Sequence, residues 1–239
     1  MTSRSVLMQE VRERFRKGGG FALATINMDH LVKMRSSSPF SRAYAAQDLV
    51  VADGHSIVAL ARLAKRPLEL MPGSDLIEPL CRMAADEQIK VALVGTTQRA
   101  LEDAARELHA KVENLDIVSC IAPSGRFEPD SPEADAILDK VQAKGARLCF
   151  LALGAPKQEI FALRGRERTP DIGFASVGAG LDFLGGHQVR APRWMRALTL
   201  EWLWRALSSP RRLLPRYLRC FAVLPLYVFL ALRQRSTAP

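Results

Sequence analysis

The 239-residue chain lacks several patterns that would indicate its function directly. Its four cysteines include no CxxC pair, so neither a disulfide framework nor a thiolate zinc site is expected, and a reducing compartment suits them. The four histidines have neither metal-ligand spacing nor clustered Cys or Asp partners, so we expect no protein-held metal. Residues 1–20 alternate charged and apolar side chains and lack the apolar core of a signal peptide. These absences suit a reducing cytosol, and no metal or other cofactor site is visible in the sequence.

Acidic side chains are scarce in one part of the chain. Residues 187–239 contain ten arginines, no lysine and a single acid, Glu201, whereas residues 1–186 contain 24 basic and 24 acidic side chains. Ten minus one accounts for the whole net charge of +9. A segment this basic binds phosphate, whether in nucleic acid, in anionic lipid head groups or in a phosphorylated substrate.

A long apolar run is also missing. The most apolar stretch, residues 221–232, is twelve residues long and contains Pro225. A membrane-spanning helix needs roughly 20 apolar residues. We therefore expect this stretch to be too short to cross a membrane and to lie in the interface, where adjacent arginines add electrostatic attraction to anionic lipid.

What the chain does contain is an alternation of apolar runs with helical patterns. Runs rich in Val, Ile, Leu and Phe predict six strands, at residues 20–27, 48–53, 90–95, 115–121, 147–154 and 171–178. Continuous apolar strands separated by helices indicate a mostly parallel sheet covered on both faces, a Rossmann-like α/β fold. The pattern changes late in the chain, which predicts a sheet domain over residues 1–189 and a basic, amphipathic, helical appendage over residues 190–239.

Two neighbouring predicted strands end in polar residues. In open parallel sheets, ligands bind beyond the carboxyl ends of the strands. The first strand ends in Thr25 and Asn27, and the second ends in Asp53 and Gly54. An acid at the end of a strand, followed by glycine, suits a general base beside open backbone. Alternatively, Asp53 caps the helix that begins nearby.

The third strand and the segment before it indicate an anion or nucleotide site. Gly95 and Thr96 stand directly before a helix, where backbone N–H groups can bind phosphate, although an ordinary strand–helix turn fits equally well. Ser74 and Asp75 follow a Pro-Gly turn and are positioned to begin another helix.

The fifth and sixth strands end in further polar residues. Gln158 and Glu159 lie in the first turn of a predicted helix, where they suit a sugar or nucleotide, or are simply solvated. Gly178 frees the backbone after the sixth strand, and Asp182 follows it within reach of the same crevice. The residues alone therefore predict a nucleotide or phosphate ligand and an acid–base aspartate.

Taken together, these motifs resemble the WecG/TagA/CpsF family of glycosyltransferases. They follow the family's order across nearly the whole chain, and the "GAPKQE" motif with the arginine-rich motifs downstream of it is the most specific part. The motifs are TIN (25–27), ADG (52–54), PGSDL (72–76), LVG (93–95), LGAPKQE (153–159), VGAGLDFLGG (177–186), RAPRW (190–194), and LEWLWR with PRRLLPRYL between 200 and 218. Departures such as Leu70, where an arginine is common, bear on the identity of the donor sugar.

The resemblance implies an enzyme that transfers a sugar with inversion, without a metal, from a UDP-sugar to a polyprenyl-diphosphate-linked saccharide. Such enzymes build cell-surface polymers, including teichoic acid and exopolysaccharide, and attach peripherally to the cytoplasmic face of the membrane. The sugar would be a hexose, N-acetylmannosamine or a uronic-acid relative. A homo-oligomer is also implied, and no nucleic acid.

The resemblance also assigns roles to residues. Asp53 becomes the candidate general base, with Thr25 and Asn27 beside it. Arg205, Arg212 and Arg216 are expected to stabilise the leaving diphosphate, or alternatively to contact only lipid head groups. The remaining candidate substrate-binding residues are Gly54, Ser74, Asp75, Gly95, Thr96, Gln158, Glu159, Gly178, Asp182, Arg190 and Arg211.

The rival interpretation is a non-catalytic nucleotide- or nucleic-acid-binding protein with a basic tail. Nucleic acid offers no partner for the apolar residues 221–232, and this argues against a nucleic-acid-binding protein. Retention of Asp53 argues against a protein that has lost catalysis.

Overall fold

A computed structural model of the chain describes residues 1–189, 191–192, 195, 201–208 and 210–235, with the backbone alone described at 201, 205, 208 and 212. Six parallel strands form one sheet in the order β2-β1-β6-β5-β3-β4. The strands are β1 (Phe21–Ile26), β2 (Leu49–Ala52), β3 (Val91–Gly95), β4 (Ile117–Ile121), β5 (Leu148–Ala152) and β6 (Gly173–Ser176). The predicted α/β fold is confirmed.

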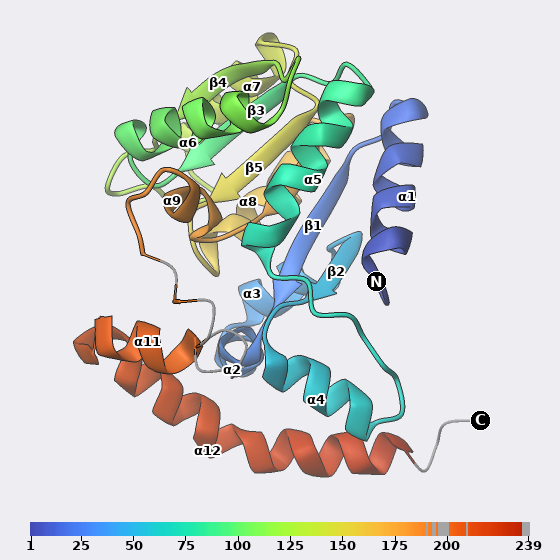
Figure 1. Cartoon of the computed structure of the whole chain (residues 1–239), viewed down its shortest axis with the longest axis vertical. Coiled ribbons are helices and arrows are strands. Elements are labelled where there is room, and N and C mark those ends of the chain that lie inside the picture. The colour runs from blue at the N-terminus through green and yellow to red at the C-terminus, as the bar shows by residue number, and fades with distance from the viewer. Residues whose placement is uncertain (190, 193–194, 196–200, 209, 236–239) are drawn as a thin grey trace.

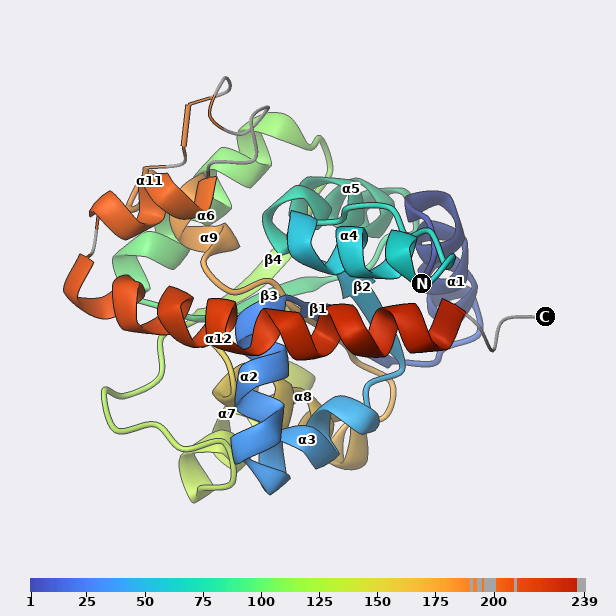
Figure 2. The same ribbon diagram turned by 90° about the horizontal axis from the view of Figure 1, so that it is seen from below.

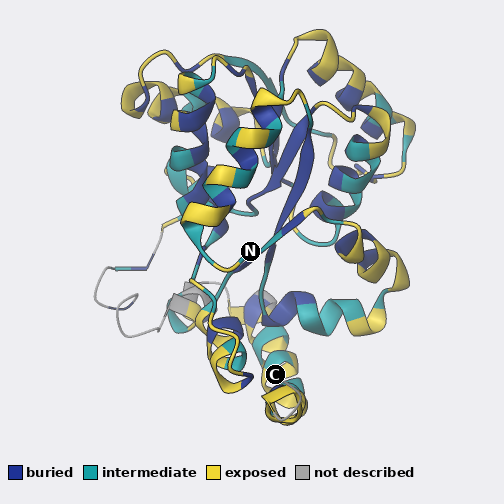
Figure 3. Ribbon diagram, turned by 90° about the vertical axis from the view of Figure 1, so that its right-hand side faces the viewer, coloured by how far each residue is buried: buried dark blue, intermediate teal, exposed yellow. Residues whose placement is uncertain are grey.

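The central strands are buried on both faces because their side chains alternate between two cores. Phe21, Leu23 and Phe150 face one core, while Ala22 and Cys149 face the other. Continuous apolar runs in the sequence are the expected signature of such two-sided burial. Figure 3 shows the strands buried at the centre of the sheet domain.

Helices cover both faces of the sheet, as Figure 1 shows. One face packs against α1 (Arg4–Arg16), α5 (Gly73–Asp86) and α6 (Gln98–Lys111). The opposite face packs against α3 (Ser38–Ala45), α7 (Pro132–Ala143) and α8 (Lys157–Arg168).

The carboxyl ends of all six strands lie at one edge of the sheet, which we call the carboxyl edge. Four helices start or lie at this edge: α2 (Met28–Ser36), α4 (His55–Leu63), α9 (Gly180–Leu184) and α12 (Pro210–Arg235). A further helix, α11 (Glu201–Ser208), packs on α12 through edge-to-face contact of Trp202 with Tyr217 and Phe221. Figure 2, seen from below, shows α12 running across the carboxyl edge over α2.

One face of α12 is packed and the other is exposed. Cys220, Val223, Leu224 and Tyr227 contact the apolar residues of α2 and α4, and the Tyr227 hydroxyl donates to the carbonyl of Leu31 at 3.3 Å. We call the exposed apolar side chains the outer stripe: Leu214, Leu218, Phe221, Leu226, Phe229, Leu230 and Leu232. Figure 3 shows this helix, at the C-terminal end, with exposed residues along its outer side.

The prediction that the C-terminal apolar segment is too short to cross a membrane is wrong, because α12 has both the length and the composition of a membrane-spanning helix. Leu213–Arg235 is 23 residues long and contains an 18-residue stretch with a mean hydropathy of 1.5, so the helix is long and apolar enough to span. The apolar run counted in the sequence began only at Phe221, after Arg219, whereas the helix begins eleven residues earlier at Pro210 and includes Leu213, Leu214 and Leu218. Length alone does not decide between spanning and lying flat, and α12 lies packed along the domain.

Candidate active site

The ends of β1 and β2 bring four of the predicted site residues together. The two strands pair in register, with Ile26 beside Ala52, and the backbone N–H of Asp53 donates to the carbonyl of Ile26 at 2.8 Å. A Cβ atom built on Gly54 would lie 3.9 Å from the Cβ of Asn27. Asp53 therefore stands next to the segment from Thr25 to Asn27, as the sequence predicts.

Asp53 does not occupy the capping position that the alternative interpretation gave it. The N-cap residue of α4 is Gly54, whose φ of 106° lies in a region that L side chains rarely adopt. Asp53 lies one residue before that cap, at the end of β2. The glycine turns the chain sharply out of the sheet and into α4, which leaves the carboxylate at the carboxyl edge.

Thr25 and Asn27 are held by the first turn of α2 and by α3. The carbonyl of Thr25 accepts hydrogen bonds from the Tyr44 hydroxyl and from Nδ1 of His30, the latter at 2.8 Å. Asn27 is the N-cap of α2, and its side chain accepts from the backbone N–H of His30 at 3.1 Å. This end of β1 is therefore fixed by buried hydrogen bonds before any substrate binds.

His30 is neutral in this setting. Its pKa is lowered to about 4, chiefly by burial; the charges of Lys33 and Arg216 act in the same direction, while the hydrogen bond to Thr25 and the charge of Asp29 oppose the shift. Because a carbonyl only accepts, the proton of the neutral ring belongs on Nδ1, facing Thr25. Burial raises the pKa of Tyr44 well above its usual range, with Glu159 and Asp53 adding to the shift, so Tyr44 also stays neutral and donates.

The N-terminus of α5 packs against the turn that follows β6. A Cβ on Gly73 would lie 3.1 Å from Cα of Val177 and 3.3 Å from Cγ2 of Thr25, and one on Gly180 would lie 3.1 Å from Cα of Ser74. Larger residues would push these segments apart. The predicted residues Ser74, Asp75 and Gly178 thus lie in segments that border the end of β1.

The end of β3 is occupied by contacts within the protein. Gly95 is needed because a Cβ there would approach the carbonyl oxygen of Ala152 to 2.4 Å. The Thr96 hydroxyl donates to Asp182, which also accepts from Gln188 at 3.1 Å. Thr97 caps α6 through its own hydroxyl. Gly95, Thr96 and Asp182 are brought together as predicted, and the contacts tie the start of α6 to α9.

The start of α8 places two polar residues in the interior. Gln158 and Glu159 are buried, so the alternative that they are solvated helix residues is wrong. Gln158 donates to Oε1 of Glu159 at 2.8 Å, while Oε1 of Gln158 and Oε2 of Glu159 have no hydrogen-bond partner among the described residues. Burial raises the pKa of Glu159 to about 7. Lys157 turns away and pairs with Glu128 at 3.0 Å.

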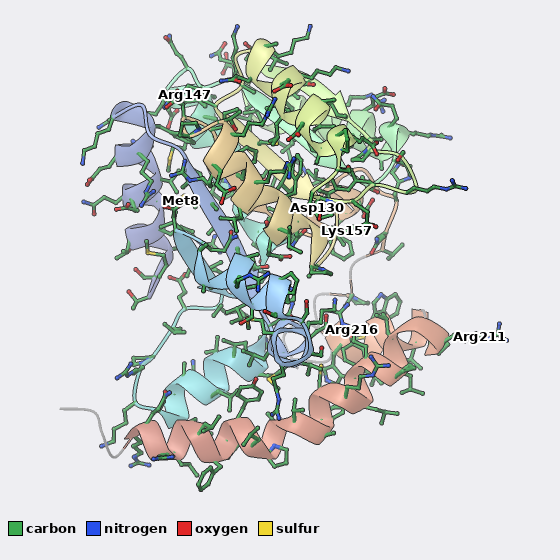
Figure 4. The ribbon with its side chains drawn as sticks, turned by 180° about the vertical axis from the view of Figure 1, so that it is seen from behind. Met8, Asp130, Arg147, Lys157, Arg211 and Arg216 are labelled. Carbon is green, nitrogen blue, oxygen red and sulfur yellow. The ribbon has the colours of Figure 1, made fainter. Side chains whose placement is uncertain are left out.

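The predicted arginines differ in placement. Nε of Arg216, on α12, lies 2.9 Å from Oδ1 of Asp29 on α2, whereas Arg211 is exposed near the start of α12 (Figure 4). Arg190 and the side chains of Arg205 and Arg212 lie outside the described residues, so the roles predicted for them stay predictions.

Four further residues at this edge have no motif in the sequence that marks them: His30, Tyr44, Asp29 and Lys33. The spacing of Asp29 and Lys33, four residues apart on one helix, is the single available signal, and it is common on solvated helices. Within the part of the chain that the structure describes, no group of three His, Cys, Asp or Glu side chains is placed to hold a metal ion. That a metal is not required stays a prediction.

The carboxyl edge of the sheet combines three features: an acid at a strand end, polar backbone fixed beside it, and a basic, apolar helix that crosses the edge. This arrangement suits a group-transfer enzyme that acts on an anionic substrate.

Comparison with known families defines the class further. The model of the glycosyl transferase WecG/TagA/CpsF family matches residues 1–239, and the chain belongs to that family. The resemblance noted in the sequence motifs is thereby confirmed over the whole chain.

Proposed function

We propose that this glycosyltransferase moves a sugar, with inversion, from a UDP-sugar to a polyprenyl-diphosphate-linked saccharide at the cytoplasmic face of the membrane. The sugar belongs to the class of hexoses, N-acetylmannosamine and uronic-acid relatives. The observation that carries the proposal is the position of Asp53, which stands beside the fixed end of β1 at the edge that α12 crosses.

In the proposed reaction Asp53 is the general base. Its carboxylate takes the proton of the attacking acceptor hydroxyl as the new glycosidic bond forms. The bond between the anomeric carbon and the β-phosphate oxygen breaks in the same displacement, and UDP leaves with the bonding electrons. A single displacement needs one base and inverts the anomeric centre, so no second carboxylate is required.

The leaving UDP carries negative charge that must be stabilised. Arg216 reaches the carboxyl edge from α12, and the N-terminus of α5 adds backbone N–H groups with no side-chain cap. We assign Arg205 and Arg212 to the same diphosphate on their family motif. One well-placed donor of this kind is worth about 3 kcal/mol, or roughly 100-fold in rate.

The outer stripe supports membrane attachment as part of the function. It exposes apolar side chains along the length of α12, with the exposed Arg211 and Arg219 near its start and Arg235 at its end. A helix with one packed face and one exposed apolar face suits the interfacial plane, where its opposite face still contacts α2 and α4. A polyprenyl-linked acceptor lies in that same plane.

The test is a donor screen with a single substitution. Purified protein supplied with a lipid-linked acceptor and candidate UDP-sugars releases UDP, and Asp53→Asn lowers kcat by about 10²- to 10⁴-fold because the base is lost. UDP-sugar binding, measured by calorimetry, stays unchanged in that variant. Asp86→Asn, at the exposed end of α5, is the matched control and retains full activity.

Two outcomes would contradict the proposal. Normal turnover by Asp53→Asn would assign the base to another group. Tight UDP binding by the wild type without turnover of any donor would favour the non-catalytic nucleotide-binding alternative.

A further inference from the structure

One buried carboxylate joins α12 to the sheet domain. Asp29, in the first turn of α2, is 8% exposed. Its Oδ1 lies 2.9 Å from Nε of Arg216, and its Oδ2 lies 2.8 Å from Nζ of Lys33. One negative charge thus faces two positive charges, so the group as a whole is cationic.

The same group reaches the start of α8. Nζ of Lys33 also donates to the carbonyl of Ala155 at 3.0 Å, in the turn that leads from β5 into α8 and to Gln158. Asp29 therefore connects α12, α2 and the β5–α8 turn, three segments far apart in the sequence that meet at the carboxyl edge.

The geometry of the pairs indicates attraction by charge more than by directed hydrogen bonds. Oδ2 of Asp29 and Nε of Arg216 are buried and have no aligned hydrogen-bond partner among the described residues, although each lies within 3 Å of an opposite charge. A buried charge depends on its partners, and long cationic side chains lose rotamer freedom when a partner holds them. The carboxylate thus restrains both cations while leaving their remaining N–H groups for other acceptors.

We propose that Asp29 is a positioning residue that holds Arg216 and Lys33 at the carboxyl edge for an anionic diphosphate. This inference rests on the proposed function, because it takes the nucleoside diphosphate of the donor as the anion. Asp29 itself contacts no substrate. Because Arg216 and Lys33 are already restrained before the donor binds, they lose little conformational entropy on binding. This lowers the free-energy cost of binding the diphosphate and of stabilising the transition state.

The sign of one effect separates positioning from simple charge. If total charge alone mattered, Asp29→Asn would remove a negative charge beside the anion site and would improve donor binding and transfer. Positioning predicts the opposite result, because Arg216 and Lys33 lose the group that orients them.

The experiment is a double-mutant cycle of Asp29→Asn and Arg216→Gln in the full chain, with UDP release as the measurement. We expect Asp29→Asn to lower kcat/KM at least about tenfold in the wild-type background and much less in the Arg216→Gln background. Asp29→Glu, which keeps the charge, recovers part of the loss. A fully additive cycle, or an Asp29→Asn variant as active as the wild type, overturns the proposal.

A second readout separates failure of this inference from failure of the proposed function. Amide hydrogen exchange in residues 210–220 needs no substrate, and we expect Asp29→Asn to accelerate it without lowering the global melting temperature. Asp139→Asn is the matched control, because its exposed pair with Arg168, at 2.8 Å, joins α7 to α8 away from α12. If the wild type transfers no sugar, the proposed function fails while the exchange measurement still tests Asp29. Unchanged exchange in Asp29→Asn overturns the inference.

Discussion

The sheet domain and α12 use the same apolar residue types in opposite ways. In the sheet domain, Phe150 and Phe174 are fully buried between layers, and the charges of residues 1–186 balance. On α12, Phe221 and Phe229 are more than half exposed, and the basic residues of the C-terminal segment have one acid beside them. A folded domain covers its own apolar surface, so an exposed stripe of this kind indicates a surface that something else covers. The difference separates the apolar surface that stabilises the fold from the apolar surface on α12 to which we assign membrane attachment in the proposed function.

A matched pair of substitutions gives the largest expected contrast. Phe174→Ala removes a buried ring that contacts Phe161 and should lower the free energy of unfolding by about 3–5 kcal/mol. Phe229→Ala, whose ring is 62% exposed, should change it by less than about 0.5 kcal/mol while weakening binding to lipid vesicles. Urea denaturation and vesicle sedimentation measure the two effects.

The pair also shows how the comparison could break. If Phe229→Ala destabilised the fold as strongly as Phe174→Ala, the outer stripe would be part of a core, as in an oligomer. If it left vesicle binding unchanged, the stripe would not be the lipid-contacting surface.

The sheet domain also buries an acid, Glu159, which should make the stability of this domain depend on pH. The pKa of Glu159 is raised from 4.5 to about 7, so the folded state binds its proton more tightly than the unfolded state does. The stability that this proton contributes is complete below about pH 4.5 and is lost as the pH rises to about 7. Glu159→Gln should remove this dependence.

The expected difference is measurable by urea denaturation from pH 4 to 8. Above pH 7 the Glu159→Gln variant should be more stable than the wild type by at most about 3 kcal/mol, and the gain should vanish near pH 4.5. Glu133→Gln, at the start of α7, is a control of opposite sign: hydrogen bonds from Ser124 lower the pKa of Glu133, so this variant should lose stability at neutral pH instead of gaining it. A difference that did not change with pH would show that Glu159 titrates near its ordinary value.

The sequence predicted the sheet better than it predicted contacts between distant segments. Six apolar runs predicted the six strands, because two-sided burial requires apolar residues on both faces of each strand. The rule that parallel strands end at one edge put Asp53 and Thr25 at the same edge, and the family resemblance put them side by side. These predictions depend on local pattern and on strand direction, both of which the sequence carries.

Burial of polar groups was the part that the sequence did not predict. For Gln158 and Glu159 the sequence left a substrate site and solvated helix positions equally open, since their burial depends on α3 packing against α8. The pair of Asp29 with Arg216 spans most of the chain and exists only because α12 returns to α2. Counting apolar residues only after Arg219 likewise underestimated the length of α12, since a helix includes the arginines that extend from its surface.

The smallest expected effect concerns single arginines of α12. Arg219→Gln should weaken binding to vesicles rich in anionic lipid by about 1 kcal/mol, roughly fivefold, because each basic side chain near such a surface contributes about that much. Binding to neutral vesicles and the free energy of unfolding should stay unchanged, since Arg219 is exposed on the helix surface.

Arg99→Gln, on an exposed position of α6, is the matched control and should leave vesicle binding unchanged. Vesicle sedimentation at low and at high salt measures the difference, which salt should reduce by screening. An equal loss for Arg99→Gln would mean that total charge, and not the basic surface of α12, attracts the membrane; the contrast between the two regions would then hold for apolar surface alone.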